Sequence, residues 1–308
     1  MVTGEVIWMN GEFVPWAEAK VHVLTHALHY GTGVFDSMRA YETESGTAIF
    51  RNTDHLDRLQ KSAAYYRMTL PYTTAELREV THELINRNGF TGCYLRPIAY
   101  RAFGPMGLFP LDNAVDVSIA AWEWGAYLGD EGKTNGIRVR TSSWRRMGQD
   151  SFIPQSKATG QYLNSVLAKL EAVESGVDEA IMLDRRDFVC EGSGENIFLV
   201  TGGQVVTPPL TASILDGINR RSIMQISADL GRPVIERDIA RAELMDADEL
   251  FLTGTAAELT PINEIDGHKI GAPGPITSEI AKVFDNALHG RDQRYSEWLD
   301  IVPVQSTV

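Results

Sequence analysis

The sequence predicts a two-domain α+β protein, with helices and strands in both domains. Its 308 residues are about twice the roughly 150 residues of a common domain. Strand-like alternation and the three- and four-residue spacing of helices both recur along the chain. Four glycines with mixed charges fall within residues 125–136, a change of composition that marks a domain boundary. We therefore expect an N-terminal domain over residues 1–124, a linker over 125–136 and a C-terminal domain over 137–308.

The N-terminal domain should open with a β-hairpin, because Asn10-Gly11 is a strong two-residue turn signal between alternating segments. Two segments with apolar residues every three or four positions predict helices, the second ending at Gly89. Prolines and glycines within residues 104–113 predict a loop. The expected strands are residues 5–9, 12–15, 37–42, 48–51, 93–100 and 115–122, and the expected helices are 53–68 and 74–88.

The C-terminal domain shows short apolar strands separated by turn residues, with helical segments between them. One predicted helix carries an apolar face, made of Leu163, Val166, Leu167, Leu170 and Val173. The expected strands are residues 137–142, 180–184, 188–190, 196–201 and 204–207, and the expected helices are 162–175, 219–230 and 278–289.

Charge and composition exclude several classes of protein. Lys and Arg number 28 against 41 Asp and Glu, so the formal net charge is −13, which disfavours nucleic acids and anionic membranes as partners. No segment reaches the roughly 18 apolar residues of a membrane span, and the N-terminus lacks the pattern of a signal peptide. Cys93 and Cys190 make neither a disulfide framework nor a CxxC metal site. We expect a cytoplasmic protein without nucleic-acid or membrane partners.

Three histidines, His22, His26 and His29, would share one face of a helix, which is compatible with a metal site. No acidic or cysteine ligand shares their spacing, so we expect structural histidines and no metal. The glycines at 31–33 and 192–194 do not complete a GxGxxG pattern between a strand and a helix, so no dinucleotide site is predicted.

Lys157 lies among small neutral residues between a strand and a capped helix. If it is partly desolvated there, its amine is a nucleophile for a carbonyl group; otherwise it is a solvated loop lysine. Glu191, Glu195 and Asn196 are compatible with a plain polar turn, and Arg58 with a solvated helix charge. The residue types alone leave these alternatives open.

Nine short segments occur in an order that is typical of one family. They are IWMNGE at 7–12, KVHV at 20–23, HALHYGT at 26–32, DHLDRL at 54–59, YLRP at 94–97, WGAYL at 124–128, KATG at 157–160, EGSGEN at 191–196 and GTAAE at 254–258. From about Val6 to about Leu299 the chain resembles the class IV, fold-type-IV pyridoxal-phosphate (PLP) aminotransferases, and most closely the branched-chain-amino-acid aminotransferases. The resemblance implies two α/β domains, as in D-amino-acid aminotransferases, with the active site between them.

The resemblance also implies three catalytic residues. Lys157 would form the internal aldimine with PLP and, once displaced by substrate, move the proton between Cα and C4′. Glu191 would pair with the pyridine nitrogen and deepen the electron sink, and Tyr162 would hydrogen-bond O3′. The cofactor would alternate between PLP and its amino form, PMP, in ping-pong half-reactions.

The phosphate of PLP needs positive charge and backbone N–H groups. An arginine offers a planar fork, and the turn before a predicted helix offers N–H groups at the helix start. By resemblance, the PLP-binding residues are Arg58, Lys157, Tyr162, Glu191, Leu215, Gly217, Ile218, Asn219 and Thr255, with Leu215 packed on the ring.

The substrate pocket implied by the resemblance has three parts. Apolar walls would surround a branched side chain, other groups would hold the α-carboxylate, and an arginine would accommodate the second carboxylate of glutamate. The wall residues are Phe35, Ser37, Met106, Leu108 and Trp124; the α-carboxylate residues are Tyr94, Thr255, Ala256 and Ala257; the residues for the second carboxylate are Tyr30, Arg96 and Tyr127.

The chain departs from the family mainly around this pocket. Where Phe-Glu-Gly-Ile-Arg is usual, residues 35–39 read Phe-Asp-Ser-Met-Arg, so Ser37 narrows or repolarises the pocket. The loop at 104–110 is bulkier than usual, and in the family it reaches a neighbouring subunit's site. Asp216 and Asn219 replace a frequent proline and threonine, and Gln161 replaces an asparagine.

We therefore predict a transaminase that moves the amino group of L-leucine, L-isoleucine and L-valine to 2-oxoglutarate, as a homodimer or a hexamer. The main alternative is an (R)-amine or D-amino-acid transaminase with a shifted substrate range. Two others are a PLP lyase of the aminodeoxychorismate type and an inactive binding protein. The intact Lys157, Glu191, Tyr162 and Arg58 disfavour the inactive protein.

Overall fold

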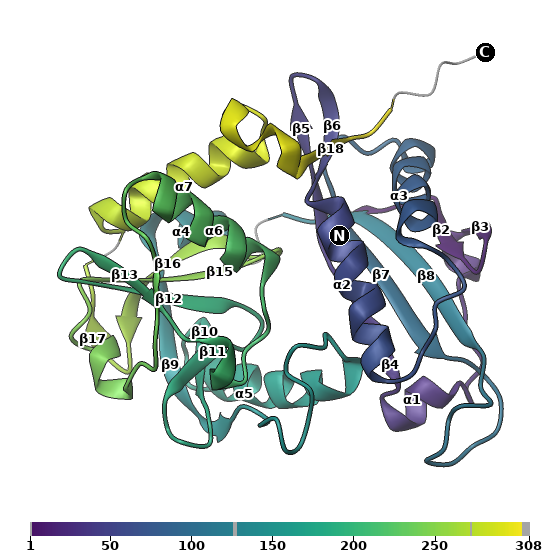
Figure 1. Ribbon diagram of the computed structural model, residues 1–308, viewed down its shortest axis with the longest axis horizontal. Helices are drawn as coiled ribbons and strands as arrows, with labels where there is room; N and C mark the ends of the chain where they lie inside the picture. The colour runs from purple at the N-terminus through teal and green to yellow at the C-terminus, as the bar shows by residue number, and fades with distance from the viewer. Residues whose placement is uncertain (1, 126–127, 272, 304–308) are drawn as a thin grey trace. The chain divides into compact units, whose positions relative to one another are not determined.

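The computed structural model describes residues 2–125, 128–271 and 273–303 (Figure 1). Contacts divide the chain into two compact units. Unit 1 comprises Met1–Trp124, Ser156–Gly160 and Asn286–Val308, and unit 2 comprises Gly125–Gln155 and Gln161–Asp285.

This division differs from the predicted one in two respects. Residues 156–160 and 286–308 join unit 1, because Ala158 bridges to Val34 and strand β18 (Leu299–Ile301) pairs with β6 (Gly46–Phe50). Helix α4 (Asp130–Asn135) occupies much of the predicted linker, and Leu128 packs against the core of unit 2. The segment 125–136 is therefore part of unit 2.

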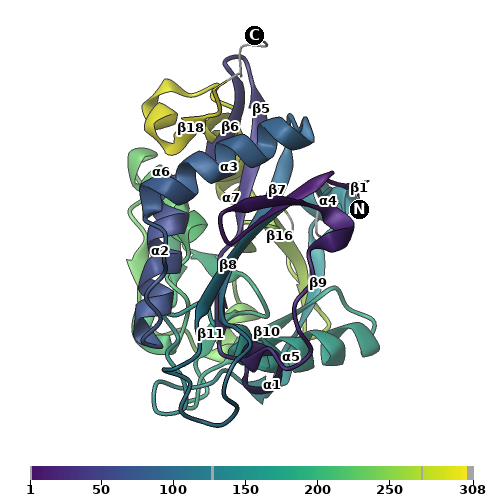
Figure 2. The same ribbon diagram turned by 90° about the vertical axis from the view of Figure 1, so that its right-hand side faces the viewer.

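Unit 1 is built on one antiparallel sheet with strand order β18-β6-β5-β7-β8-β2-β3, to which β1 and β4 add at β8 and β7. Helices α2 and α3 pack on this sheet (Figures 1 and 2). The other strands and α-helices of unit 1 are β1 (Val2–Thr3), β2 (Val6–Met9), β3 (Glu12–Pro15), α1 (His26–Tyr30), β4 (Gly33–Phe35), β5 (Met38–Thr43), α2 (Asn52–Tyr65), α3 (Thr74–Asn88), β7 (Cys93–Arg101) and β8 (Val115–Glu123).

Local signals explain two of these elements. In the β2–β3 hairpin, Asn10 and Gly11 have φ of 48° and 98°, the positive values that a two-residue hairpin turn requires. Helix α3 begins with a capping box between Thr73 and Glu76 and ends at Gly89 in the left-handed region. The predicted hairpin and the predicted end of this helix are both confirmed.

Strands β7 and β8 have two different faces. Leu95, Ala99, Val117, Ile119 and Ala121 are fully buried and alternate along the strands with a second set of residues. The second set comprises Tyr94, Arg96, Ile98, Tyr100, Ser118, Ala120 and Trp122. The second face therefore carries polar and aromatic groups, including two residues predicted for the substrate pocket.

Unit 2 contains a sheet with strand order β11-β10-β9-β16-β15-β12-β13-β14, and an additional pairing of β11 with β12 closes six of these strands into a ring. The strands are β9 (Ile137–Arg145), β10 (Glu179–Leu183), β11 (Val189–Gly192), β12 (Asn196–Thr201), β13 (Gln204–Thr207), β14 (Ile235–Glu236), β15 (Glu249–Gly254), β16 (Glu258–Ile265) and β17 (His268–Lys269). The longer helices are α5 (Tyr162–Glu174), α6 (Ile218–Asp229) and α7 (Pro275–Leu288).

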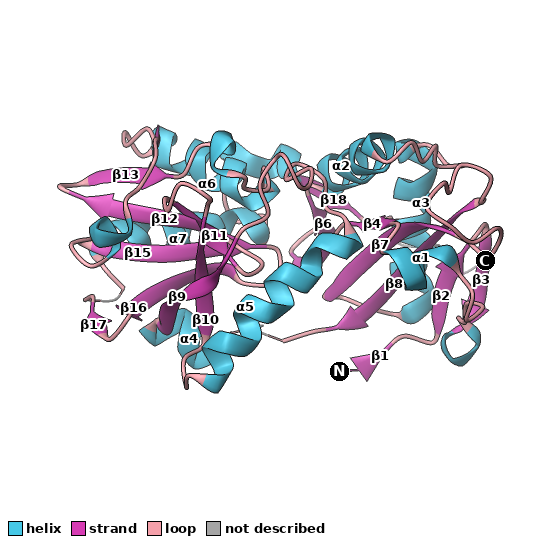
Figure 3. Ribbon diagram, turned by 90° about the horizontal axis from the view of Figure 1, so that it is seen from below, coloured by secondary structure: helices cyan, strands magenta, loops and turns pink. Residues whose placement is uncertain are grey.

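Helix α5 lies alongside β9 and β10 (Figure 3). It packs with its small residues, because Ala168 and Ala172 form a buried cluster with Ala180 and Met182. The predicted apolar face exists, but its five residues are between 40% and 69% exposed. This face is therefore outside the core of the chain.

Candidate active site

Lys157 is buried in unit 1, with 9% of its surface exposed. Its backbone N–H donates to Ser62 Oγ over 3.1 Å, and its carbonyl accepts from the N–H of Phe35 over 2.9 Å. Its Nζ lies 5.1 Å from the centre of the Phe35 ring. The alternative of a solvated loop lysine is therefore wrong, and the backbone of Lys157 is fixed on both sides.

Arg58 is paired with a fully buried carboxylate. Asp36 accepts from Arg58 Nε and Nη2, each over 2.8 Å, and contacts His55 Nδ1 at 2.7 Å. Burial alone would raise the pKa of Asp36, but Arg58 and His55 outweigh it and hold that pKa well below its ordinary value. Burial also lowers the pKa of His55. Arg58 is thus an oriented cation and not a solvated helix charge.

Aromatic rings surround Arg96 on the second face of β7. Its guanidinium carbon lies 4.8 Å from the ring centre of Phe35, 5.3 Å from that of Tyr94 and 5.9 Å from that of Trp122, distances typical of cation–π contacts. Its Nη2 donates to the Tyr94 hydroxyl over 3.3 Å, while its Nε is buried without a partner among the described residues. The Tyr94 ring also contacts Trp124, with centres 4.7 Å apart. The structure thus joins four predicted pocket residues.

Trp122 was not predicted for this cluster. Its ring centre lies 5.0 Å from that of Tyr94, its register partner on β7. The alternation of β8 was a signal that could have found it, since Trp122 and Trp124 are two residues apart. Ser37 is buried between β4 and β5, where its backbone N–H donates to Asp36 Oδ1 over 2.7 Å.

The predicted loop residues are largely exposed in this single chain. Met106 and Leu108 are 43% and 89% exposed, and Tyr30 is 41% exposed. The loop is tied to helix α1, because His26 Nε2 lies 2.7 Å from the carbonyl oxygen of Gly107. Tyr127 lies outside the described residues.

The three histidines each contact backbone or hydroxyl groups. His26 Nδ1 also lies 2.8 Å from Thr32 Oγ1; His29 Nε2 lies 2.9 Å from the Val23 carbonyl oxygen; and His22 Nδ1 accepts from a backbone N–H over 3.1 Å. Within residues 2–125, 128–271 and 273–303, no group of three metal-binding side chains occurs.

Glu191 is buried in unit 2, where β11 pairs with β12. Its Oε1 lies 2.8 Å from Arg146 Nε. Its Oε2 accepts from Asn196 Nδ2 over 3.2 Å and from the N–H of Leu215 over 3.1 Å. Glu191 is therefore a held carboxylate and not part of a plain polar turn.

The turn before helix α6 is attached to the same group. Asn196 Nδ2 donates to the Leu215 carbonyl over 3.0 Å, and a Cβ on Gly217 would lie only 2.0 Å from Asn196 Oδ1. No side chain caps α6, so its first N–H groups suit an anion. The free N–H groups at the start of α6 fit a phosphate group beside Ile218 and Asn219.

Sheet register brings the 255–257 turn to the end of unit 2 that also holds Glu191 and Asn196. Asn196 pairs with Thr253, and Gly254 pairs with Glu258 across the turn. Thr255, Ala256 and Ala257 form that turn.

Tyr162 is the first residue of α5. That end of the helix is attached to the end of β9, because Asn164 Nδ2 donates to the Arg145 carbonyl over 3.1 Å.

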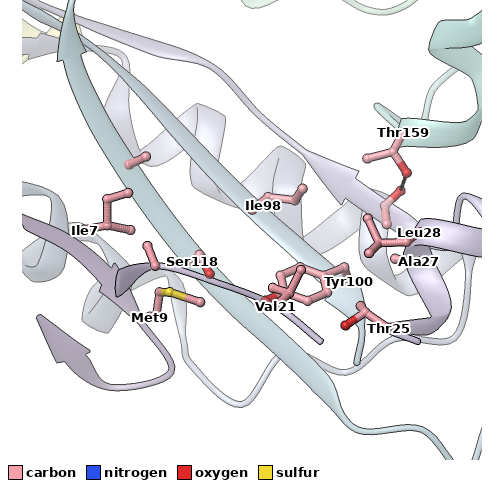
Figure 4. A pocket seen from close by; sticks show the side chains of 13 residues that line it. Ile7, Met9, Val21, Thr25, Ala27, Leu28, Ile98, Tyr100, Ser118 and Thr159 are labelled. Carbon is pink, nitrogen blue, oxygen red and sulfur yellow. Dashed lines mark hydrogen bonds between the residues drawn. The ribbon is translucent and has the colours of Figure 1, made fainter. Parts of the chain in front are cut away.

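An apolar pocket of about 380 Å³ lies in unit 1, on the second face of β7 and β8 (Figure 4). Its lining includes side chains of β2, β7 and β8 together with residues of the 19–28 segment. Thr159, two residues after Lys157, lines it and donates to the carbonyl oxygens of Gly31 and Gly33 over 3.0 and 3.1 Å. The lining contains none of the predicted site residues.

Comparisons with known proteins match nearly the whole chain. The family model described as amino-transferase class IV matches residues 33–265. A branched-chain-amino-acid aminotransferase of Pseudomonas aeruginosa is 46% identical over 299 residues, which cover 96% of this chain and 97% of the relative.

Solved structures of branched-chain amino acid aminotransferases also match nearly the whole chain. The branched-chain amino acid aminotransferase of T.th., solved with pyridoxamine 5'-phosphate, has a TM-score of 0.95 at 45% identity and covers 98% of this chain and 100% of that one. The same T.th. enzyme complexed with N-(5'-phosphopyridoxyl)-L-glutamate has a TM-score of 0.93 at 45% identity, with coverage of 98% and 100%. The likeness therefore includes the residues of both units.

Proposed function

Because this chain belongs to the class IV aminotransferases, we propose that it transfers the amino group of L-leucine, L-isoleucine and L-valine to 2-oxoglutarate. The predicted family and α+β fold class are confirmed by the matches over both units. The observation that carries the substrate proposal is the aromatic cluster around Arg96, since it combines apolar walls with one partly buried cation. The apolar walls suit a branched side chain, and the cation suits the second carboxylate of the acceptor.

The family depends on PLP, which when bound supplies an electron sink for the carbanion formed at the substrate Cα. In unit 1 the proposed holding residues are Lys157, which would hold the cofactor covalently through Nζ, and Arg58. In unit 2 they are Tyr162, Glu191, Leu215, Gly217, Ile218, Asn219 and Thr255, of which Glu191 would face the pyridine nitrogen and Ile218 and Asn219 the phosphate. The uncapped start of α6 and the buried Glu191 support this assignment.

Lys157 is the proposed acid and base of the reaction. Its Nζ would move the proton from the substrate Cα to C4′ in one half-reaction and in the opposite direction in the other, because a tethered amine beside the reacting bond can act in both directions. Its burial supports this role, since a buried amine is shielded from bulk water.

The substrate residues divide by the chemistry they offer. Phe35, Ser37, Trp124 and the loop residues Met106 and Leu108 would form the walls. Backbone groups of Thr255, Ala256 and Ala257, with Tyr94, would hold the α-carboxylate, and Arg96 with Tyr30 and Tyr127 would hold the second carboxylate.

A half-reaction panel tests the proposed substrates. The holoprotein is mixed with L-leucine, L-valine, L-glutamate, D-alanine or (R)-1-phenylethylamine, and the absorbance band of the bound cofactor is followed. Rapid loss of the band with the three L-amino acids alone would support the proposal. Preferential loss with D-alanine or the (R)-amine would replace it by the (R)-amine or D-amino-acid transaminase, for which the departures from the family at Ser37 and in the 104–110 loop leave room.

A test of Lys157 accompanies the panel. Lys157→Ala should abolish transamination and the absorbance band of the covalently held cofactor together. Retained steady-state turnover would remove Lys157 from the catalytic role.

We further propose that the protein is a homo-oligomer, at least a dimer. The apolar face of α5 in unit 2 and, separately, the loop residues Leu108 and Phe109 in unit 1 are exposed in the single chain, and exposed apolar surface of this kind marks an interface. Leu167→Lys with Leu170→Lys should reduce the mass measured by light scattering to that of a monomer, whereas Glu79→Lys on α3 should not. An unchanged mass in the double variant would contradict an interface on α5.

We propose a cytoplasmic location, supported by two buried free thiols, Cys93 and Cys190, since structural disulfides are rare in a reducing compartment. In the described part of the chain, no helix is both long and apolar enough to cross a membrane. Fractionation of cells that express the protein would test the location, and its recovery outside the cytoplasmic fraction would contradict it.

A further inference from the structure

Arg146 is a buried arginine that none of the nine family segments contains. It follows β9 directly, and only 6% of its surface is exposed. Its backbone N–H donates to the Leu183 carbonyl over 2.8 Å. Its side chain pairs with Glu191 through Nε and donates from Nη1 to Ser165 Oγ over 3.4 Å. The backbone and the guanidinium are thus both held.

A buried ion pair of this kind is weak support for the fold. Removing two charges from water costs free energy that their attraction does not always repay, and apolar side chains of similar volume often stabilise a protein as well. The strands beside the pair already share a large apolar core, contributed by β9, β10, β11, β12, β15 and β16. The stability of the fold therefore does not explain the pair, and its role lies in what Arg146 does to Glu191.

The two oxygens of Glu191 are held by different donors. Arg146 pairs with Oε1, while Asn196 Nδ2 and the N–H of Leu215 donate to Oε2. Donors on both oxygens fix the rotation of the carboxylate about its last bond, which a single donor does not. The same Asn196 holds the turn before α6, so the carboxylate and the proposed phosphate site are tied together.

We propose that Arg146 is a positioning residue that fixes and charge-balances Glu191 before the cofactor arrives. This inference rests on the proposed function, in which Glu191 faces the pyridine nitrogen of PLP. In the apoprotein, Arg146 pairs the buried carboxylate. In the holoprotein, it keeps that carboxylate oriented beside the ring nitrogen.

The apoprotein gives the first test, which is independent of activity. Arg146→Gln leaves Glu191 buried without its cation, so the Tm at pH 8 should fall. Adding Glu191→Gln should restore part of the Tm, because it removes the unpaired charge. Additive losses in the double variant would overturn the proposal, since they would mean that Arg146 acts only through packing. Arg145→Gln is the matched control, because the neighbouring Arg145 forms an exposed pair with Asp187 and should change the Tm little.

Binding of PLP to the apoprotein gives the second test. The Kd for PLP, measured by quenching of tryptophan fluorescence, should rise at least about tenfold in Arg146→Gln, a factor that corresponds to roughly 1.4 kcal/mol. Arg146→Lys should lie between wild type and Arg146→Gln, because it keeps the charge but loses the planar fork. An unchanged Kd in Arg146→Gln would overturn the proposal. Absence of PLP binding by the wild type would instead refute the proposed function, while the apoprotein cycle would still report on the pair.

Discussion

Gly217 is a position where one methyl group should disturb the cofactor site. Its backbone, with φ of −67° and ψ of 134°, is open to any L-residue, so alanine brings no backbone strain. The obstacle is space, because an added Cβ would lie 2.0 Å from Asn196 Oδ1 and 3.2 Å from Arg220 Cβ. Gly217→Ala must therefore displace either Asn196 or the start of α6.

The size of the effect follows from either route of relaxation. Forcing a methyl group into a packed region costs about 1–3 kcal/mol. If Asn196 moves instead, it loses its bonds to Glu191 and to the Leu215 carbonyl, each worth about 0.5–1.5 kcal/mol. Both routes give a loss of about 1–3 kcal/mol in the free energy of unfolding.

Calorimetry of the apoprotein measures this loss without any reaction. The Tm should fall by about 1.5 °C for each kcal/mol, because the entropy of unfolding is about 2.1 cal/mol/K per residue, and the Kd for PLP should rise as well. Gly271→Ala is the matched control, because its Cβ would meet nothing within 4 Å and its φ is not positive. If Gly217→Ala and Gly271→Ala melt at the same temperature, the contact with Asn196 is not tight and the reasoning is refuted.

Three further predictions concern other charged groups. Burial, with the neighbouring charge of Glu179, raises the pKa of Glu195 from 4.5 to about 8; the folded state therefore holds a proton that the unfolded state releases, and stability should fall as pH rises from about 4.5 to about 8. Glu195→Gln should flatten that fall in Tm between pH 6 and pH 9, and an equal slope in both proteins would contradict it. Arg96→Ala should raise the KM for glutamate and 2-oxoglutarate far more than that for leucine, whereas equal losses would mean a common or structural role. Burial would raise the pKa of Asp300, but hydrogen bonds from His82, Arg78 and Asn52 outweigh it and hold that pKa well below its ordinary value. The stabilisation that Asp300 contributes is therefore present above its ordinary pKa and is lost on acidification. Asp300→Asn should then cost about 1.5–3 kcal/mol in urea unfolding at neutral pH and less at acidic pH; an equal cost at both would contradict the charge argument.

Elements with local signals could be predicted from the sequence. The Asn10-Gly11 turn and the boundaries of α3 depend on residues within a few positions of each other. Strands β4, β15 and β16 were not predicted. Strand β15 is buried on both faces and shows no alternation, and β16 contains Pro261. Such strands are specified by distant partners and not by their own pattern.

The apolar face of α5 shows the limit of periodicity. The spacing predicted the helix and the face correctly, but the face is exposed, and the helix packs with Ala168 and Ala172 instead. Periodicity identifies a surface that avoids water. It does not say whether the same chain or another copy covers that surface, and this is why the oligomer is a proposal.

The residues of the candidate site also divide into those that the sequence could predict and those that it could not. Lys157 and Glu191 could be predicted because they lie in segments typical of the family. Asp36 and Arg146 were missed because each acts through a partner, Arg58 at 22 positions and Glu191 at 45. Only the fold brings such pairs together, since no spacing in the sequence relates them.

The two buried pairs also explain where substrate preference can vary. Asp36 fixes Arg58, and Arg146 fixes Glu191, so two of the groups proposed to hold the cofactor are each oriented by a side chain outside the proposed substrate pocket. The backbone N–H of Ser37 donates to Asp36 Oδ1, and this bond does not depend on the identity of the side chain. A change of the Ser37 side chain would therefore alter the proposed pocket wall while this backbone hydrogen bond is kept. The departure from the family at Ser37 is thus compatible with a retained Asp36–Arg58 pair, and the substrate range is where we expect this chain to differ from its relatives.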